Sequence, residues 1–244
     1  MHDDHRPDGD LTRLSGTQPS DTPPTVAVVD DAALMRRLFQ SAFPRLDVVG
    51  TYASVDELLA AHPTADLVVL DLLLSTSLQS EGVLQGPAAI RALTGSGYPR
   101  ICLYTDERRP LVLAHCLSVG ASGFARKSDD LEVSEEAFLR VAAGDTVIAR
   151  SMVGLAELLA RRGSLPELTT RQSEVLAARS RGEKWEAIGR RLGISTDTAR
   201  GHLENVMTKM VWYLHDAGVD PDAPPADVER ALGLAPGDLM DPSS

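Results

Sequence analysis

Long apolar runs are missing from this 244-residue sequence. A helix that crosses a bilayer needs about 20 consecutive apolar residues, and no stretch of the chain comes near that length. The first residues, MHDDHRPDGD, also lack the basic and then apolar order of a secretory signal. We therefore expect a cytoplasmic protein that makes no contact with the membrane.

Cysteine is scarce, since the chain contains only Cys102 and Cys116. One lies in an apolar run and the other in the helical segment that follows it. Two cysteines placed in this way provide neither a disulfide framework nor the spacing of a cysteine metal site. We expect both to be buried, reduced thiols.

Positive charge is also scarce, because the chain has 24 basic and 35 acidic side chains and a formal net charge of -11. Spread evenly, this charge would argue against binding to nucleic acid. It is spread unevenly: residues 166–217 hold 8 basic and 7 acidic side chains, whereas residues 218–244 hold 1 and 6. The middle segment alone is slightly basic.

Apolar, strand-like runs alternate with helical patterns through the first half of the chain. Runs this apolar are typical of a parallel sheet covered on both faces, and right-handed crossovers between them give a doubly wound sheet. We predict an α/β domain with a five-stranded parallel sheet over residues 25–145. The expected strands are residues 25–30, 47–51, 66–71, 100–105 and 122–126, and the expected helices are residues 32–43, 54–61, 86–94, 110–119 and 132–143.

Helical patterns alone follow Gly144. They predict a linker over residues 146–165 and then a small all-α domain with a helix-turn-helix layout over residues 166–217. The expected helices are residues 151–161 in the linker, residues 170–181 and 185–192, and a third helix of the small domain from Ser195 to about Ala217.

Capping residues mark several of these helix starts. Ser54 with Glu57, and Thr169 with Gln172, have the spacing of a capping box, in which the two side chains satisfy backbone amides of the first turn. Ser195 can cap the third helix of the small domain in the same way.

Both ends of the chain are polar. Residues 1–24 are rich in Asp, Pro, Gly, Ser and Thr, and we expect a disordered arm there. The extension of residues 218–244 is acidic, with a short helix expected at residues 226–232. This helix is either a passive surface element or one that supports dimerisation or covers the basic face.

Residues suited to phosphate chemistry stand at the ends of four expected strands. Parallel sheets bind ligands at the carboxyl ends of their strands, so the fold would bring these residues together. Taken singly, each has a plain structural explanation as a helix cap, a turn residue or a solvated charge. Their joint positions favour a phosphate-accepting site. In strand order they are Asp30 and Asp31, Asp71, Thr105 and Lys127.

Three carboxylates in such a site oppose each other's ionisation until a cation is bound. Mg²⁺ suits them, because it prefers oxygen ligands and keeps several waters. Asp71 would then attack an incoming phosphoryl group, while the Lys127 ammonium and the Thr105 hydroxyl would stabilise the phosphoryl oxygens.

These segments carry a resemblance to a known family. VVDDAALMRR, DLVVLD, the threonine of CLYT, and GASGFARK resemble the flavodoxin-like receiver domain of two-component response regulators. LTTRQSEVLAARSRGEKWEAIGRRLGISTDTARGHLENVMTKM resembles the LuxR-type DNA-binding domain. Over residues 25–215 the chain is similar to NarL-type transcription factors.

The resemblance implies a role for each strand-end residue. It also places Phe124 at an aromatic switch position, with core packing as the equal alternative. The implied roles are phospho-acceptor for Asp71, Mg²⁺ ligands, directly or through water, for Asp30 and Asp31, and phosphate contacts for Thr105 and Lys127.

The chain departs from the family pattern just after the phospho-acceptor. The family usually has Met-Pro there, whereas LLLSTSLQSEGVLQ precedes Gly86 in this chain. The extra residues lie within 75–85 and either hinder phosphorylation, shield the acyl phosphate or form a solvated loop.

The third helix of the small domain is expected to read DNA. Ala199, Leu203, Val206 and Met210 recur at helical spacing and should face the core. Glu204 stands where the family often has a basic or small polar residue, so it either weakens DNA binding or accepts a hydrogen bond from cytosine. The candidate DNA-binding residues are Thr198, Arg200, Gly201, Glu204 and Lys209.

We interpret the chain as a DNA-binding transcriptional regulator controlled by phosphorylation of Asp71, and not as an enzyme. The expected partners are DNA, a sensor histidine kinase and a second copy of the chain, because one slightly basic domain neutralises few phosphates. One alternative is a receiver that answers to a small ligand or a protein partner without phosphorylation. Another is a Mg²⁺-dependent phosphohydrolase, which Leu73 disfavours because no second acid follows Asp71 at that position.

Overall fold

A computed structural model describes residues 22–74, 84–220, 223–234 and 239 of the chain. The expectations for the N-terminal arm and for the segment after the phospho-acceptor fall mostly outside these residues. None of the helices in the described part of the chain combines the length and the apolar character that a bilayer span requires.

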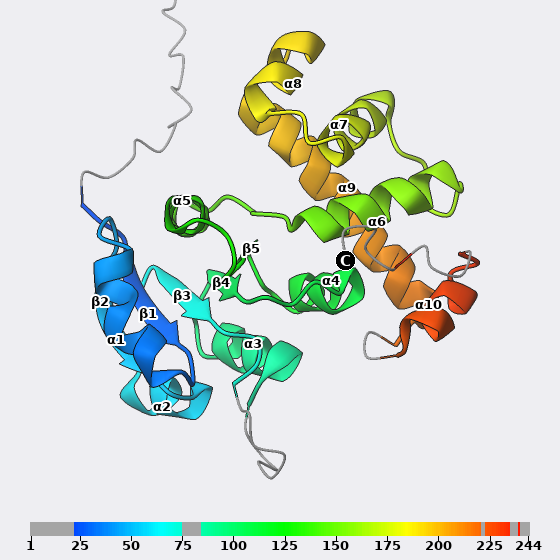
Figure 1. Ribbon diagram of the computed structural model, residues 1–244. Coiled ribbons are helices and arrows are strands. Elements are labelled where there is room, and N and C mark those ends of the chain that lie inside the picture. Colours follow the sequence, from blue (N-terminus) through cyan, green and yellow to red (C-terminus); the bar gives the residue numbers. More distant parts are fainter. Residues whose placement is uncertain (1–21, 75–83, 221–222, 235–238, 240–244) are drawn as a thin grey trace, which may run out of the picture.

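The first half of the chain forms the predicted five-stranded parallel sheet (Figure 1). The strand order is β2-β1-β3-β4-β5, so the chain starts next to one edge and reverses direction once, as a doubly wound sheet does. The predicted fold class is therefore confirmed. The strands are β1 (Thr25–Val29), β2 (Asp47–Tyr52), β3 (Leu67–Leu70), β4 (Ile101–Tyr104) and β5 (Gly123–Ala125).

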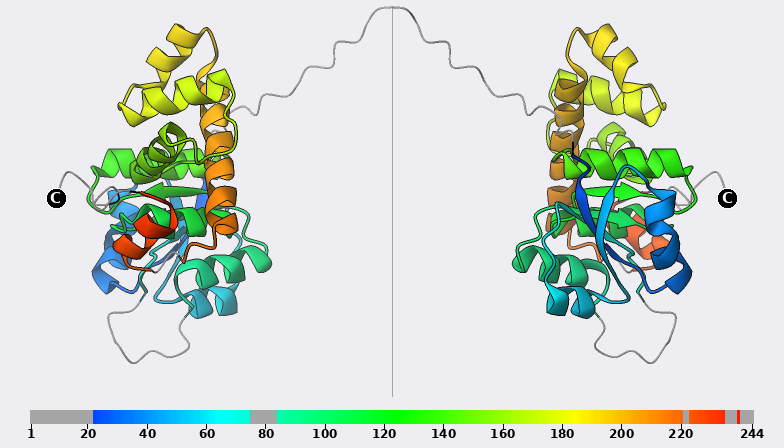
Figure 2. Two further views of the ribbon diagram at one scale, coloured as in Figure 1. Left: turned by 90° about the vertical axis from the view of Figure 1, so that its right-hand side faces the viewer. Right: turned by 90° about the vertical axis from the view of Figure 1, so that its left-hand side faces the viewer.

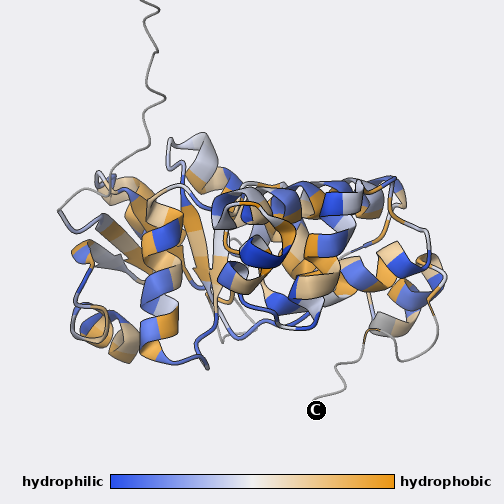
Figure 3. Ribbon diagram, turned by 90° about the horizontal axis from the view of Figure 1, so that it is seen from above, coloured by the Kyte–Doolittle hydropathy of each residue, from blue (hydrophilic) through white to orange (hydrophobic). Residues whose placement is uncertain are grey.

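Helices cover both faces of this sheet. Strands β3 and β4 are apolar along their length and β1 after its first residue, whereas the edge strand β2 and most of the helices carry both polar and apolar residues (Figure 3). On the face of α1 and α5, the rings of Phe39, Phe43 and Phe138 pack against Tyr104 from β4. The helices are α1 (Ala33–Ala42), α2 (Val55–Ala61), α3 (Gly86–Gly95), α4 (Pro110–Ser118) and α5 (Leu131–Ala142).

Helices alone make up the described part of the second half, as predicted. The helix α9 is long and runs beside both halves of the molecule (Figure 2). The element boundaries agree with the expected ones to within a few residues. They are α6 (Arg150–Arg161), α7 (Thr170–Ser180), α8 (Trp185–Leu192), α9 (Thr196–Asp216) and α10 (Pro225–Ala231).

The capping predictions are confirmed for the helices of the second half. Thr169 and Gln172 form a complete capping box at α7, and the Ser195 hydroxyl accepts a hydrogen bond from the Thr198 amide at α9. At α2 the box is incomplete. The Ser54 hydroxyl accepts from the Glu57 amide, but the Glu57 carboxylate accepts from the amide of Ala53 instead of Ser54.

The two halves share one hydrophobic core. The cluster that fills the face of α2, α3 and α4 continues without a break through α6 into α7 and α9. Helix α4 packs directly against α6 and α9 (Figure 1). The predicted inner face of α9 is confirmed, since Ala199, Leu203, Val206 and Met210 are all buried. Both cysteines are buried and neither forms a disulfide, as expected.

Two residues of the second half narrow the sequence-based readings. The side chain of Trp212 is 72% exposed, which excludes a core position and leaves a dimer contact as a prediction. For the short helix of the extension, α10, the reading as a passive surface element is wrong, because α10 buries Val228 in the shared core, together with Leu232 and Leu234 just after it. Arg162 at the end of α6 donates a hydrogen bond to the carbonyl oxygen of Gly233 and ties this segment down.

Gly189 is essential to the turn between α8 and α9. A Cβ atom at this position would lie 2.8 Å from the carbonyl oxygen of Ile194, which is a backbone atom and cannot move away without a shift of the chain.

We predict that Gly189→Ala destabilises the helix-turn-helix domain by about 1–3 kcal/mol, as measured by urea unfolding followed by circular dichroism. Gly154→Ala is the matched control, because its Cβ meets nothing within 4 Å in α6. The control should be neutral or more stable by up to about 1 kcal/mol. Equal stability of the two variants would contradict the close approach at Gly189.

Candidate functional site

Three carboxylates meet at the carboxyl edge of the sheet. Asp30 and Asp31 follow β1, and Asp71 follows the neighbouring strand β3. Oxygen atoms of the three side chains lie within 4.8 Å of one another. Asp30 and Asp71 are buried, and Asp31 is half-buried. The sheet therefore brings together the predicted phospho-acceptor and both predicted metal ligands.

Lys127 completes this cluster from the loop after β5. Its Nζ donates to Asp30 Oδ2 at 2.8 Å and to Asp71 Oδ2 at 2.7 Å. One ammonium thus neutralises part of the charge of two buried carboxylates, and the positions follow from the strand order, because β5 ends at the same edge as β1 and β3.

Backbone groups fix the carboxylates in these positions. Asp30 Oδ1 accepts from the Ala32 amide at 2.8 Å, and Asp71 Oδ1 accepts from the Leu73 amide at 3.3 Å. Arg36 donates to the carbonyl oxygens of Asp30 and Asp31 at 2.6 and 2.8 Å. Arg36 lies in the VVDDAALMRR segment, about one and a half turns after the acidic pair, but its residue type alone does not predict this role.

Burial raises the pKa of the Asp71 carboxyl group, and the negative charge of Asp30 adds to this effect. The hydrogen bond from Lys127 and the charge of Lys127 oppose the shift without cancelling it. Burial also lowers the pKa of Lys127, but its hydrogen bonds to Asp30 and Asp71 prevail and raise that pKa above its ordinary value. The charged form of Lys127 is therefore stabilised by its partners, whereas burial destabilises the ionised form of Asp71.

The donor set fits a magnesium ion. Three carboxylates supply hard oxygen ligands, and the excess of negative charge over the single ammonium favours a divalent cation. Asp30, Asp31 and Asp71 are the residues that would hold it.

Thr105 and Phe124 are buried residues of the strands beside this edge. Thr105 follows β4, and its hydroxyl oxygen accepts from the Glu107 amide at 3.2 Å. Phe124, in β5, packs into the hydrophobic core shared by the two halves, so core packing accounts for its position. The switch role of Phe124 and the phosphate contact of Thr105 stay predictions.

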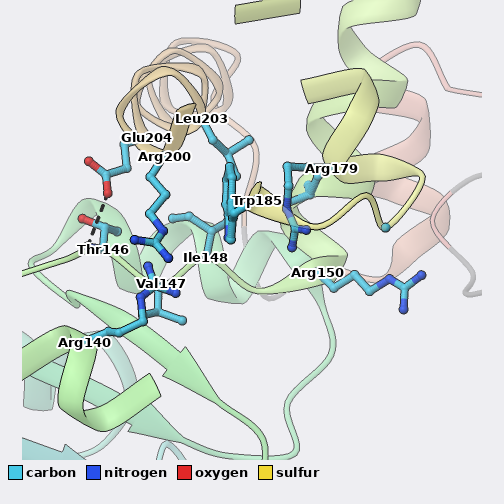
Figure 4. A pocket seen from close by; sticks show the side chains of 12 residues that line it. Arg140, Thr146, Val147, Ile148, Arg150, Arg179, Trp185, Arg200, Leu203 and Glu204 are labelled. Carbon is cyan, nitrogen blue, oxygen red and sulfur yellow. Dashed lines mark hydrogen bonds between the residues drawn. The ribbon is translucent and has the colours of Figure 1, made fainter. Parts of the chain in front are cut away.

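The residues expected to read DNA lie on α9, and two of them face the first half of the chain (Figure 4). The Thr146 amide, in the linker, donates to Glu204 Oε1 at 3.3 Å. Arg200 pairs with Asp197 at 3.0 Å and lies 3.8 Å from Asp145, and its side chain is only 23% exposed. Arg200 and Glu204 lie outside the buried face of α9, but the end of the receiver domain and the linker cover them.

The other three candidate DNA-binding residues differ in exposure. Thr198 is exposed at the start of α9, and Gly201 is half-exposed one turn later. Lys209 donates to the carbonyl oxygen of Glu167 and, at 3.1 Å, to Gln172 Oε1. The ammonium of Lys209 therefore holds the start of α7, a structural role that its charge alone does not indicate.

A short backbone pairing joins the strand-end site to the linker that covers α9. Val147 forms a bridge to Gly123 in β5, with the Phe124 amide donating to the Val147 carbonyl oxygen at 3.0 Å. A Cβ atom on Gly123 would lie 2.5 Å from Cγ2 of Val141 and 3.1 Å from Cβ of Val147, so this close approach requires glycine. No sequence pattern predicts this pairing, because a single bridge has no periodicity.

Comparisons with known proteins agree for both halves. Residues 166–212 match the family model described as bacterial regulatory proteins, luxR family. The chain is 31% identical over 188 residues to the probable transcriptional regulatory protein SgaR of Hyphomicrobium methylovorum, an alignment that covers 76% of this chain and 85% of that protein. It is 26% identical over 199 residues to the nitrate/nitrite response regulator protein NarL of Escherichia coli K12, covering 77% of this chain and 89% of NarL.

The fold also has a counterpart among solved structures. RcsB from Salmonella enterica serovar Typhimurium, bound to promoter P1flhDC in the presence of phosphomimetic BeF3⁻, superposes with a TM-score of 0.50 at 18% identity. The match covers 86% of this chain and 98% of RcsB, and at this identity it bears on the fold alone. The sheet order, the carboxylate cluster, the helix-turn-helix and the similarity to SgaR together place the chain in one family: it belongs to the NarL-type response regulators, with a receiver domain followed by a luxR family domain.

Proposed function

We propose that this response regulator binds DNA under the control of phosphorylation at Asp71. The observation that carries the proposal is the position of the Asp71 carboxylate, next to two further carboxylates and 2.7 Å from the Lys127 ammonium. A buried carboxylate with a raised pKa and a cation beside it is a suitable phosphoryl acceptor. By name, SgaR is a probable transcriptional regulatory protein and NarL of Escherichia coli is a response regulator protein, which supports a regulatory role and not a metabolic one.

The phosphoryl transfer is an in-line displacement at phosphorus. An oxygen of the Asp71 carboxylate attacks and forms a new P–O bond, while the bond to the donor breaks and the leaving group takes its electron pair. The donor would be a phosphorylated histidine of a sensor kinase or a small acyl phosphate. A bound magnesium ion would neutralise part of the negative charge on the phosphoryl group that is transferred.

Lys127 has to change partners when phosphate is attached. Its ammonium bonds both Asp30 and Asp71, and a phosphoryl group on Asp71 replaces a charge of one carboxylate by the larger charge of the phosphoryl oxygens. The lysine would follow this charge, and the Thr105 hydroxyl is the other expected phosphate contact. Since Lys127 follows β5 by two residues, its movement acts on the strand to which the linker is paired.

The linker is what phosphorylation would have to release. In the described arrangement it covers Arg200 and Glu204, so α9 is not free to enter a major groove. A shift of β5 would disturb the pairing with Val147 and thereby the contact of Thr146 with Glu204. Phosphate then favours an open form, and two open copies can present two α9 helices to successive grooves.

The two rival functions have less support. A receiver that works without phosphorylation would not need the Lys127 bridge between two buried acids. A phosphohydrolase would need a general acid near the leaving group, and the residue two positions after Asp71 is Leu73, whose side chain is exposed and apolar.

Phosphorylation of Asp71 is the first prediction of this proposal. With Mg²⁺ and acetyl phosphate, the wild-type protein should gain the mass of one phosphoryl group, whereas Asp71→Asn should gain none. Asp56→Asn, at an exposed position on α2, is the matched control and should label like the wild type. Intact-mass spectrometry measures all three.

Further variants separate acceptance of phosphate from its effect. Asp30→Asn or Asp31→Asn should abolish the labelling that depends on Mg²⁺, while Lys127→Ala should allow some labelling but block the effect on DNA binding. If Asp71→Asn labels as well as the wild type, the acceptor lies elsewhere and the proposal fails.

Arg200 gives the second prediction. In the phosphorylated protein, Arg200→Ala should cost about 1–3 kcal/mol of binding free energy at a specific site if Arg200 contacts a base edge. If Arg200 contacts phosphate instead, the loss should be the same for every sequence. Competition binding at fixed salt distinguishes these results, with Arg161→Ala, an exposed arginine of α6 paired to Glu157, as the control. Unchanged affinity on all sequences would mean that α9 does not read DNA.

The oligomeric state gives the third prediction. The 8 basic and 7 acidic side chains of residues 166–217 gain little from counterion release, so useful affinity requires two copies on two half-sites. Phosphorylation should therefore shift the protein from monomer to dimer in sedimentation velocity and raise its DNA affinity. A protein that is dimeric and binds DNA equally in both states would rule out control by phosphate.

A further inference from the structure

Four arginine side chains line a cavity of about 270 Å³ between the receiver domain and the helix-turn-helix domain (Figure 4). Arg140 comes from the end of α5 and Arg150 from the start of α6, while Arg179 and Arg200 come from α7 and α9. Among the residues found to line this cavity, Glu204 is the single acidic one. Such a cationic lining stands out in a chain whose formal net charge is -11.

Two of these arginines have carboxylate partners. Arg140 pairs with Asp145 at 3.0 Å, and Arg200 pairs with Asp197 at 3.0 Å. These partners lie at the side of the cavity and are not among the residues that line it. Within the lining, the single negative charge of Glu204 therefore does not balance the four positive charges of the arginines.

The other two arginines lack such partners in the described part of the chain. No carboxylate there forms an ion pair with Arg150 or Arg179. One Arg179 nitrogen donates to the carbonyl oxygen of Glu183, and its guanidinium lies over the Trp185 ring at 4.5 Å. The Nε atoms of Arg179 and Arg200 are buried and, within the described residues, have no hydrogen-bond partner. Buried donors of this kind cost free energy until an acceptor is supplied.

The cations also repel one another. Burial lowers the pKa of Arg179, and the positive charges of Arg150, Arg140 and Arg200 lower it further. A bound anion would remove both penalties at once, because it accepts hydrogen bonds and neutralises charge.

The shape and chemistry of the lining restrict the anion. Guanidinium groups match phosphate oxygens with two parallel hydrogen bonds, which makes phosphate the preferred partner of clustered arginines. The lining also includes the apolar side chains of Val147, Ile148, Val153 and Leu203. Apolar side chains beside four cations suit a phosphate that carries an organic group better than a bare inorganic ion.

We propose that this cavity binds a small organic phosphate of the nucleoside monophosphate class, as a second input that is separate from Asp71. The ligand would bridge the two domains, since Arg140 comes from the receiver domain, Arg150 from the linker helix, and Arg179 and Arg200 from the helix-turn-helix domain. It would then stabilise the form in which the linker covers α9. Because a ligand shifts an equilibrium by its differential affinity for the two states, and on the basis of the function proposed above, the same ligand should weaken binding to DNA.

Binding is measured directly on the full-length, unphosphorylated protein without DNA, so that its outcome does not depend on the proposed function. The probes are AMP, inorganic pyrophosphate and, as the neutral counterpart, adenosine, each at millimolar concentration in isothermal titration calorimetry. AMP should bind more tightly than pyrophosphate, which has no organic group to contact the apolar side chains, and adenosine should not bind. Arg150→Gln should weaken AMP binding about tenfold, because one charged hydrogen bond is lost, and Arg179→Gln should do so by at least as much.

A control variant and a check of folding show whether the loss of AMP binding is specific to the cavity. Arg171→Gln, an exposed arginine of α7 paired with Glu174, is the matched control and should leave AMP binding unchanged. Arg150 is exposed at the start of α6 and lies outside the phosphorylation site and the reading residues of α9. The Arg150→Gln variant should therefore label at Asp71 like the wild type, which shows that it is folded.

Three outcomes would overturn the inference. Failure of both AMP and pyrophosphate to bind removes the site. Equal binding to the wild type, Arg150→Gln and Arg179→Gln places the anion elsewhere on the surface. A third outcome is that neither small anion binds, while the phosphorylated Arg150→Gln and Arg179→Gln proteins bind DNA more weakly than the phosphorylated wild type. The arginines would then contact the DNA backbone instead of a small ligand. If AMP binds as expected but leaves DNA affinity unchanged, the cavity is a ligand site and the proposed link to DNA binding is wrong.

Discussion

The ammonium of Lys127 lies between two buried carboxylates, and the arrangement of the receiver domain depends on this contact. Asp30 and Asp71 would repel each other at the carboxyl edge of the sheet if no cation lay between them. Breaking such a pair by removing one partner is far more costly than the net contribution of the intact pair. The site is therefore stable with Lys127 in place and sensitive to any new charge on Asp71, which is the property that a phosphorylation switch requires.

A change at this contact reaches α9 through very few steps. Lys127 follows β5, β5 pairs with the linker at Val147, and the next residue back, Thr146, donates to Glu204 on the reading helix. On the other side, α4 packs on α6 and α9 within one apolar cluster. The polar contacts of the linker are few and weak in water, whereas the apolar contacts of α4 are extensive. Opening therefore has to separate or re-dock an apolar surface, and a second copy of the chain is one means of covering it.

The sequence predicts the strand-end site well because the positions follow from topology. Once β1, β3, β4 and β5 are parallel neighbours, Asp30, Asp71, Thr105 and Lys127 must meet at one edge. It also predicts the inner face of α9, since helical spacing reports burial within an element. The sequence does not predict features that depend on how one surface docks on another. No periodic signal marks the cover over Arg200, the exposed Trp212 or the buried Val228 of α10.

At Arg200, contacts within the chain compete with the proposed contacts to DNA. In the covered form its guanidinium lies 3.8 Å from Asp145 and beside other arginines, so leaving that position loses one modest ion pair and relieves repulsion, while its partner Asp197 is on α9 and moves with it. DNA offers the same guanidinium phosphates or a guanine edge. Under the proposed function, coupling between the sites is reciprocal, so DNA that binds only the open form would favour phosphorylated Asp71 as much as phosphorylation favours DNA binding. The 8 basic and 7 acidic side chains of residues 166–217 fit this proposal, because contacts within the chain can compete with DNA when a domain gains little from counterion release.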